Sequence, residues 1–504
     1  IGCQLIELFL SLDNGIKYLS KSKLLPQISE IVAQIDPFSG ITSKDPILSE
    51  KRLETTASVG YLRFIGVLSS HSLGIRMLEQ WQFFTLFLNI ISSSTESETN
   101  NLFILTIFKY ADFSIDSPFR NTLEMAIRVS NFKIRNYLLK HVLPRLIKTE
   151  ECRLFIIRIL VENLYCIGPS ENGNGDGEIV TKSIEILYHY YQEDNFSNLD
   201  TLIQYQPLIE VLQKYRLGKK LLNNFLRFPE GFKYLERLGY LEEKFNKLTQ
   251  AQDFKYLYKI NSIIQYQFYP HVFHADNNSN NADNDNNDAD DQLSIYFLKN
   301  LLSTEEGLNF FQFGKGKEFL HSILLSTEII FQQISQDAKF HDIENQDDEE
   351  VKFLINAVKQ NLWLIGNLAL GEFGIQLLDP MYNNSLNANN NSIINIIIDN
   401  FKTCSIWQIR GICFYVLGMI ASTIEGIEIL DEFNWVSCVD QYGNCKRLSY
   451  PKVENLVEIF NIEMSNPYRD TRYYHIFNSI PVEVTEANSN TINDDTGDNI
   501  EELA

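Results

Sequence analysis

The chain has 504 residues, of which 44% are hydrophobic, and its formal net charge is −22. A chain of this length exceeds one ordinary hydrophobic core, so we expect either several domains or an elongated array. Its longest apolar runs fall well short of the ~20 residues that cross a bilayer, and its acidity excludes the broad basic face of a general nucleic-acid-binding protein.

The acidity is concentrated in three polar segments. Residues 276–291 hold six Asp and no base, 337–350 hold seven acids against one Lys, and 483–502 hold seven acids and no base. Such segments bury too little apolar surface to offset the entropy of ordering the chain. From these and similar Asn- and Gly-rich stretches we predict a flexible loop at 168–178, a disordered Asn/Asp insert at 273–293, an Asn-rich insert at 382–392 and a disordered acidic tail at 482–504.

Helical periodicity runs through most of the remaining chain. The first residues, IGCQLIELFLSL, carry no basic leader and are typical of a helix interior, so we expect an excerpt of a longer polypeptide. Apolar residues recur at helical spacing, as at Leu123, Ile127, Ile134 and Leu138, and alternating strand patterns are missing. We therefore predict an all-α chain, with helical repeats at 1–167, 179–272 and 294–381 and final repeats at 393–465.

Six glycines share one local pattern: Gly, an apolar residue, any residue, an apolar residue, then Leu or Phe. A Gly inside a helix costs about 1 kcal/mol relative to Ala, so its recurrence after apolar helical stretches needs a reason. We predict that each lies at a junction between two helices, where Gly tolerates left-handed backbone. The six repeat-junction glycines are Gly15, Gly74, Gly231, Gly307, Gly374 and Gly426.

The spacing of these glycines indicates a repeat architecture. The gaps are 59, 157, 76, 67 and 52 residues, and without the polar inserts the last three approach the ~40–47 residues of armadillo/HEAT units. We expect the longest gap to hold two or three units that lack the glycine. Stacked helical units make an armadillo/HEAT-like α-solenoid, which offers concave surface to partners rather than a pocket for chemistry.

Residue types that carry chemistry do not form a recognisable site. Cys438 and Cys445 have no second ligand pair at zinc spacing, and the few, odd-numbered cysteines favour a reducing compartment. His271 and His274 lie beside an Asp run and are expected to be solvated rather than to bind a metal. Nucleotide-binding, kinase, hydrolase and metalloprotease signatures are absent. We predict no catalytic activity and no cofactor.

A basic run in the segment 120–148 has two interpretations. The first is a solvated face of one amphipathic helix, and the second is a docking face for an acidic partner, a phosphate or an anionic lipid. The run consists of Arg128, Lys133, Arg135, Lys140, Arg145 and Lys148.

Two Trp-containing helices differ from their aliphatic neighbours. Trp363 and Asn367 lie in LWLIGNLAL, and Trp407 and Arg410 lie in IWQIRGICFYVLG. Core packing is the simpler interpretation, with Arg410 bonding carbonyls of an adjacent unit, and an interface hot spot is the alternative.

These residues also carry a family resemblance. LWLIGNLALGEFGIQLL and the later IWQIRGICFYVLGMIASTIEGIEILDEFNW resemble the Rictor/pianissimo family, the rapamycin-insensitive companion subunits of TOR complex 2. Weaker resemblance extends upstream in colinear order, through 198–212 and 221–248 to 59–79. The matching positions are Trp363, Gly366, Asn367, Gly374, Trp407, Arg410, Gly411, Tyr415, Val416, Leu417, Gly418, Gly426, Asn434 and Trp435.

The resemblance implies a scaffold. Members of this family bind the TOR kinase and the Sin1-type and Lst8-type subunits, support signalling to AGC kinases, and act in actin organisation and plasma-membrane homeostasis. It further implies a cytoplasmic protein, in part at the plasma membrane, that in some members masks the FKBP–rapamycin site. The long Asn/Asp inserts are similar to low-complexity expansions of fungal or amoebal sequences and suggest a fungal-like member. The alternative is another armadillo/HEAT-type adaptor for a small GTPase or a transport partner.

Overall fold

The computed structural model describes residues 2–94, 100–165, 174–193, 195–250, 254–268, 296–336, 340, 349–378 and 392–452. These residues form a mostly helical fold, as the periodicity predicts. Two compact units contain Ile1–Ile393 and Ile394–Ala504. The helices and strands are α1 (Gly2–Leu10), α2 (Asp13–Lys21), α3 (Leu24–Ala33), α4 (Glu50–Thr55), α5 (Val59–Ser69), α6 (Ser72–Gln80), α7 (Phe83–Ser93), α8 (Asn101–Tyr110), α9 (Pro118–Val129), α10 (Phe132–Tyr137), the π-helix η2 (Leu138–Val142), α11 (Leu143–Leu146), α12 (Glu150–Tyr165), α13 (Asn174–Glu193), α14 (Asp200–Ile203), α15 (Ile209–Lys214), α16 (Arg216–Phe225), α17 (Pro229–Arg237), α18 (Tyr240–Gln250), α19 (Lys255–Phe268), α21 (Phe297–Leu301), α22 (Glu305–Phe313), α23 (Gly316–Gln336), α24 (Glu349–Ala369), α25 (Gly374–Leu378), α27 (Ile393–Thr403), α28 (Trp407–Ile420), α29 (Ile424–Glu432), β1 (Trp435–Val439) and β2 (Cys445–Pro451).

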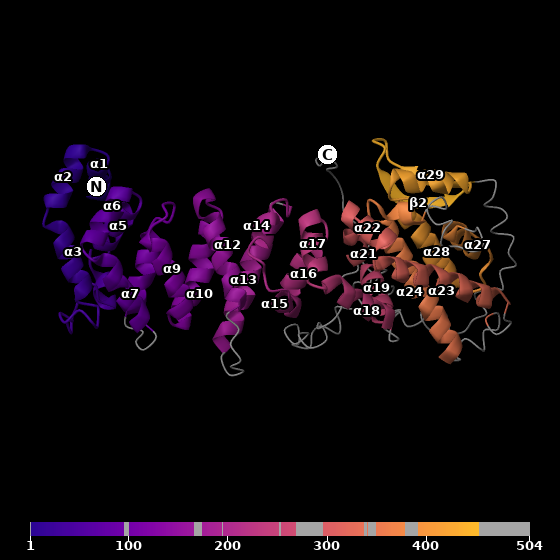
Figure 1. The fold of residues 1–504 in the computed structure, drawn as a ribbon, viewed down its shortest axis with the longest axis horizontal. Coiled ribbons are helices and arrows are strands. Elements are labelled where there is room, and N and C mark those ends of the chain that lie inside the picture. The colour runs from indigo at the N-terminus through magenta and orange to yellow at the C-terminus, as the bar shows by residue number, and fades with distance from the viewer. Residues whose placement is uncertain are drawn as a thin grey trace, which may run out of the picture. The chain divides into compact units, whose positions relative to one another are not determined.

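Helices of the first unit pack mainly against helices that are near in chain order. Examples are α5 with α8, α7 with α9, α12 with α13 and α23 with α24. Figure 1 shows helices α3 to α17 following one another in the order of the chain. Packing between sequence neighbours is the connectivity that a helical repeat array requires.

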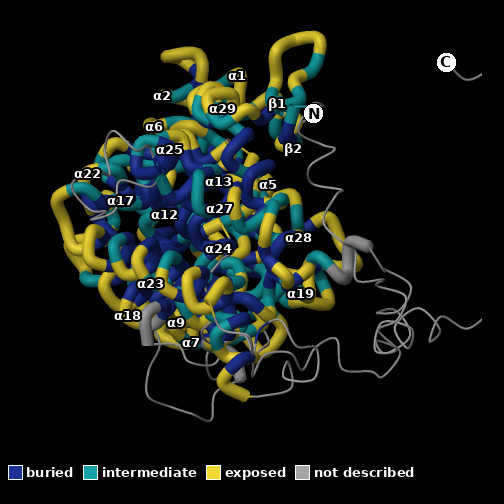
Figure 2. Tube along the Cα trace, turned by 90° about the vertical axis from the view of Figure 1, so that its right-hand side faces the viewer, coloured by how far each residue is buried: buried dark blue, intermediate teal, exposed yellow. Residues whose placement is uncertain are grey.

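Apolar side chains from successive helices form the interior of the first unit. Phe83, Phe87, Phe108 and Phe119 are each at most 1% exposed, and Phe83 and Phe119 have ring centroids 6.0 Å apart. Figure 2 shows the buried residues in dark blue on the inner sides of the helices and the exposed ones in yellow on outer turns. Each helix therefore contributes one apolar stripe to a core that it shares with its neighbours.

The predicted single helix around 120–148 is instead broken into several segments. α9 ends at Val129, and Asn131 begins α10 because its side-chain oxygen accepts a hydrogen bond from the Ile134 amide at 3.1 Å. Pro144 has no amide hydrogen to donate to the carbonyl four residues earlier. The preceding turn widens into η2, in which Leu143 N–H bonds the Leu138 carbonyl.

The all-α prediction missed one antiparallel hairpin in the second unit. β1 and β2 pair Trp435 with Pro451 and Ser437 with Ser449, and the register shifts between Ser437 and Val439. The turn contains Gly443 at φ +83°, a conformation that favours Gly. Figure 2 shows the exposed tip of this hairpin in yellow. The strands are short and irregular, so their sequences carry no clear alternation.

Segment boundaries differ from the predictions at one loop. The structure begins α13 at Asn174, so the predicted loop 168–178 extends too far at its C-terminal side. The insert 273–293, all but the last residue of the insert 382–392, and the acidic tail 482–504 lie outside the described residues, as do His271 and His274.

Candidate interaction surfaces

The pattern glycines lie at tight corners between consecutive helices. Gly426, for example, is the third residue of α29, and Thr423 accepts a hydrogen bond from its amide at 3.2 Å. A Cβ atom at Gly426 would lie 1.9 Å from the carbonyl oxygen of Ile420, the last residue of α28. The same contact, always to the carbonyl oxygen six residues earlier, is 2.4 Å at Gly15, 2.3 Å at Gly74, 2.2 Å at Gly231, 1.8 Å at Gly307 and 1.7 Å at Gly374.

The physical reason for these glycines therefore differs from the one that the sequence suggests. Positive φ occurs among the described glycines at Gly40, Gly239 and Gly443, and at none of the six. Left-handed backbone is the wrong explanation. The backbone of each short helix instead comes so close to the end of the preceding helix that a side chain has no room.

A seventh corner of the same geometry lies inside the 157-residue gap. A Cβ at Gly218, the third residue of α16, would lie 2.2 Å from the Leu212 carbonyl oxygen. The expectation that units in this gap lack the glycine is wrong at this position. The pattern missed Gly218 because Lys219 replaces the apolar residue that follows, although Leu222 keeps the Leu four residues on.

The signature residues of α24 belong to the interior of the first unit. Trp363 is 5% exposed and Asn367 is 1% exposed. Gly366, which lies between them in the sequence, is also buried. The Asn367 side-chain amide donates to the Trp363 carbonyl at 2.9 Å, one turn earlier on the same helix. For these residues the geometry favours core packing.

Arg410, on α28, bonds α27 within the second unit. It is 7% exposed, and its Nε donates to the Phe401 carbonyl oxygen at 2.7 Å, close to the end of α27. Its guanidinium carbon lies 4.7 Å from the Trp407 ring centroid and 5.7 Å from that of Phe401. Burial lowers the pKa of Arg410 from its usual value. Trp435, 1% exposed, also contacts Phe401, and the centroids of the two rings are 5.4 Å apart.

Gly418 allows the hairpin to lie against α28. A Cβ at this position would be 2.6 Å from the Arg447 carbonyl oxygen on β2. Arg447 itself has φ +56°, a conformation that is uncommon for a residue with a side chain. Sequence reasoning assigned Gly418 to the family signature without this role, because the role depends on a strand 29 residues later.

Three signature residues of α28 face solvent instead. Trp407 is 47% exposed and Tyr415 is 49% exposed. Gly411 lies between them, and a Cβ there would meet nothing within 4 Å. The sequence does not separate these residues from the buried ones, because all belong to one contiguous motif.

The basic run is spread over two successive helical stretches, α9 and the uninterrupted stretch α10–η2–α11, and the residues after them. Arg128 is on α9, Lys133 and Arg135 are on α10, Lys140 is on η2, Arg145 is on α11, and Lys148 follows α11. Arg128 bonds Glu124 at 2.9 Å and Glu162 at 2.5 Å, and Arg145 donates to the Lys109 carbonyl at 3.5 Å. Arg128 and Arg145 thus contact groups on neighbouring helices.

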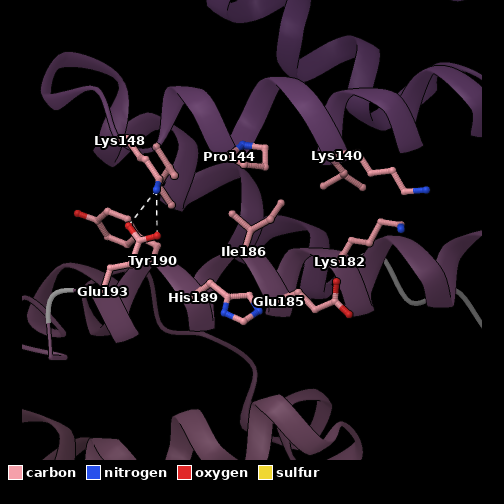
Figure 3. A pocket seen from close by; sticks show the side chains of 11 residues that line it. Lys140, Pro144, Lys148, Lys182, Glu185, Ile186, His189, Tyr190 and Glu193 are labelled. Atoms are coloured by element: carbon pink, nitrogen blue, oxygen red, sulfur yellow. Dashed lines mark hydrogen bonds and ion pairs between the residues drawn. The ribbon is translucent and has the colours of Figure 1, made fainter. Parts of the chain in front are cut away.

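Lys140 and Lys148 line a cavity of about 370 Å³ between η2, α11 and α13. Figure 3 shows Lys148 paired with Glu193 at one end, Lys140 and Lys182 at the other, and Pro144 and Ile186 between them. The Lys148–Glu193 distance is 2.9 Å, and Lys182 bonds Glu178 at 3.1 Å. The cavity has mixed charge, and docking of an anion there stays a prediction.

In the described part of the chain, no group of three or more His, Cys, Asp or Glu side chains is arranged to hold a metal ion. The described helices include none long and apolar enough to cross a membrane. The six cysteines that the structure describes, which include Cys438 and Cys445, are free thiols.

Comparison with known proteins identifies the family of the chain. Residues 39–146 match the middle domain of the rapamycin-insensitive companion of mTOR, residues 151–270 match its RasGEF_N domain, and residues 356–436 match its domain 5. The three matches lie in chain order, and the last of them extends into the second unit. The chain belongs to the Rictor family.

Relatives of this Rictor-family chain include yeast and mammalian proteins. It is 25% identical over 480 residues to the target of rapamycin complex 2 subunit ste20 of Schizosaccharomyces pombe. The aligned region covers 94% of this chain and 32% of that protein. It is 25% identical to the complex 2 subunit TSC11 of Saccharomyces cerevisiae over 87% of this chain and 28% of that protein. It is 26% identical to mouse rapamycin-insensitive companion of mTOR over 92% of this chain and 24% of that protein.

The chain thus spans between about a quarter and a third of the length of these relatives. The identities to yeast and mouse proteins are nearly equal, so a fungal-like origin stays a prediction.

Proposed function

We propose that this Rictor-family chain acts as part of a non-catalytic scaffold subunit of TOR complex 2. The observation that carries the proposal is the colinear match of three Rictor domains, together with relatives that are named as subunits of that complex. Helices that pack on their sequence neighbours and leave aromatic side chains exposed suit a protein that binds other proteins.

In this proposal the chain contributes to binding the TOR kinase and the Sin1-type and Lst8-type subunits. The complex then supports signalling to AGC kinases, actin organisation and plasma-membrane homeostasis, and the subunit contributes to masking the FKBP–rapamycin site. The protein acts in the cytoplasm and, as part of the complex, at the plasma membrane. Family resemblance supports each of these roles.

The test is affinity purification of the full-length protein from its own cells, with quantitative mass spectrometry of what co-purifies. We expect the TOR kinase and Sin1-type and Lst8-type subunits in stoichiometric amounts. A preparation without the TOR kinase, dominated by small GTPases or transport cargo, would instead favour a different armadillo/HEAT-type adaptor. Nucleotide-dependent turnover that one point substitution abolishes would contradict the non-catalytic assignment.

A further inference from the structure

Cationic side chains from three helices of the first unit gather at Tyr110, the last residue of α8. The Arg63 guanidinium carbon, from α5, lies 5.2 Å from the Tyr110 ring centroid, and the Lys109 ammonium nitrogen lies 5.7 Å from it. Arg145, on α11, donates from Nη1 to the Lys109 carbonyl oxygen at 3.5 Å. We refer to Arg63, Lys109, Tyr110 and Arg145 as the Tyr110 cluster.

The close packing of α5 against the end of α8 builds this cluster. A Cβ at Gly66 would lie 2.5 Å from the Tyr110 carbonyl oxygen, so the absence of a side chain lets the two helices come this close. The Ser69 hydroxyl, one turn further along α5, accepts a hydrogen bond from the Asp112 amide at 2.7 Å. Arg63 lies one turn before Gly66 on the same side of α5, and its side chain therefore reaches the Tyr110 ring.

Local attractions explain why cations gather here, but they leave the positive charge uncompensated. The last carbonyls of α8 carry partial negative charge, and the face of a tyrosine ring attracts cations. Neither group supplies a full negative charge. Arg63, Lys109 and Arg145 are all exposed, and none of the three forms an ion pair with another described residue. Like charges that converge on one residue repel one another, so an anion placed among them would be stabilised by all three.

The small extent of the cluster favours a compact anion. Anionic membranes attract clusters of about four to eight cations, and nucleic acids are bound by basic stripes that follow the phosphate backbone. Here the cations meet at one ring, and the loop that follows α8 carries Asp112 and Asp116. These carboxylates would repel an extended polyanion but leave room for a single anionic group.

A phosphate monoester has the charge and the acceptors that this cluster requires. At pH 7 it carries a charge of about −1.5 to −2 and three acceptor oxygens, more than one carboxylate offers. A guanidinium group can donate two parallel hydrogen bonds to such oxygens. The Tyr110 hydroxyl is a further donor in the cluster, and it makes no hydrogen bond within the described part of the chain.

We propose that the Tyr110 cluster binds the phosphate group of a phosphorylated side chain in a partner protein. Arginine-containing clusters are a recurring means of recognising phosphorylated protein segments. A phosphate presented on a protein suits a cluster whose three cations are all exposed, because residues that flank the phosphate can contact the surrounding helices. The proposal holds whichever complex contains the chain, so it stands apart from the TOR complex 2 assignment.

The test screens the full chain against peptide libraries that have phosphoserine, phosphothreonine or phosphotyrosine fixed at the centre of degenerate flanks. The best-retained peptide is then titrated by fluorescence anisotropy beside its unphosphorylated counterpart. We expect the phosphorylated peptide to bind at least about ten-fold more tightly, because charged hydrogen bonds to the phosphate are lost without it. Its affinity should fall as the NaCl concentration is raised, since the cluster is exposed to solvent.

Substitutions then locate the binding site. Arg63→Gln, Lys109→Gln and Arg145→Gln should each weaken binding of the phosphorylated peptide about ten-fold and leave the unphosphorylated peptide unchanged. Arg216→Gln is the matched control, because it removes an exposed guanidinium group on α16 that is not part of the cluster, and it should bind like wild type. Circular dichroism melting of each variant separates a loss of binding from a loss of fold.

Four outcomes overturn the proposal. The first two are a screen in which no retained peptide depends on its phosphate, and cluster variants that bind the phosphorylated peptide as tightly as wild type does. Displacement of the peptide by an equimolar amount of inorganic phosphate would assign the cluster to a free anion. Binding to phosphatidylserine vesicles that the three cluster substitutions abolish, without phosphopeptide binding, would assign it to a membrane surface.

Discussion

Gly426 and Gly411 lie on consecutive helices of the second unit, yet an added methyl group meets different surroundings at the two sites. At Gly426 it would be 1.9 Å from the Ile420 carbonyl oxygen, and at Gly411 nothing lies within 4 Å. The carbonyl belongs to the end of a helix and cannot move aside without shifting that helix. The role of each glycine is therefore set by its neighbours rather than by its own backbone angles.

This contrast predicts opposite effects of one substitution. Gly426→Ala should lower the free energy of unfolding by about 1–3 kcal/mol, because the corner must open. Gly411→Ala should raise it by about 0.5–1 kcal/mol through helix propensity. Urea denaturation of both variants measures the difference. Equal free energies of unfolding would show that the close approach at Gly426 is not a constraint. Gly426→Val should lower the free energy of unfolding more than Gly426→Ala does, because its larger side chain must also fit beside the Ile420 carbonyl.

A substitution at Arg410 tests whether its planar guanidinium group contributes to stability. Arg410→Lys keeps the charge but loses the planar group that both bonds the Phe401 carbonyl and stacks on Trp407. We expect a loss of about 1–3 kcal/mol in the free energy of unfolding and greater acrylamide quenching of Trp407 fluorescence. If Arg410→Lys is as stable as wild type, the positive charge alone accounts for the contribution of Arg410 to stability. Trp407→Phe identifies the contribution of this indole to the signal.

At the scale of elements, the hairpin depends on one turn carboxylate. Asp440 accepts hydrogen bonds from the Asn444 side chain at 3.0 Å, the Asn444 amide at 2.8 Å and the Tyr442 amide at 2.9 Å. Lys446 lies 3.0 Å from the same carboxylate. These interactions, with Asn444 foremost, lower the pKa of Asp440 to about 2 from the usual 3.8.

The lowered pKa predicts a pH dependence of the hairpin. Because the folded value lies below the unfolded one, the ionised carboxylate stabilises the turn above about pH 4, and that stabilisation is lost as the pH falls towards about 2. Hydrogen-exchange protection of the Tyr442 and Asn444 amides should fall over this range relative to amides of α28. In Asp440→Asn the protection should be low and independent of pH, and a pH-independent wild type would contradict the assignment.

Element by element, the sequence predicted helices well where apolar residues recur at helical spacing. It missed the hairpin because β1 and β2 are short, have a register shift and gain their burial from α28 and α29 rather than from alternation. It placed the basic run on one helix because the break at Ser130 and the widened turn before Pro144 depend on local hydrogen bonding. Arg128 consequently lies on one helical stretch, and Lys133, Arg135, Lys140 and Arg145 lie on the next.

For the whole molecule, packing between sequence neighbours predicts local rather than global unfolding. When each helix is stabilised mainly by adjacent ones, a defect weakens its own region and spreads little. Gly426→Ala should therefore reduce hydrogen-exchange protection in α28, α29 and the hairpin while leaving α5 to α8 unchanged. A uniform loss of protection across the chain would show a single cooperative unit.

The helical class, the recurrence of the glycines and membership of the Rictor family follow from the amino-acid sequence alone, because periodicity and ordered motifs are properties of the order of residues along the chain. The packing of the helices shows why those glycines are needed, that Gly218 lies at a seventh corner, and which signature residues are buried. Trp363 and Arg410 pack inside while Trp407 and Tyr415 face solvent. Those distinctions depend on distances to carbonyls and rings remote from each residue, which no local pattern of residue types specifies.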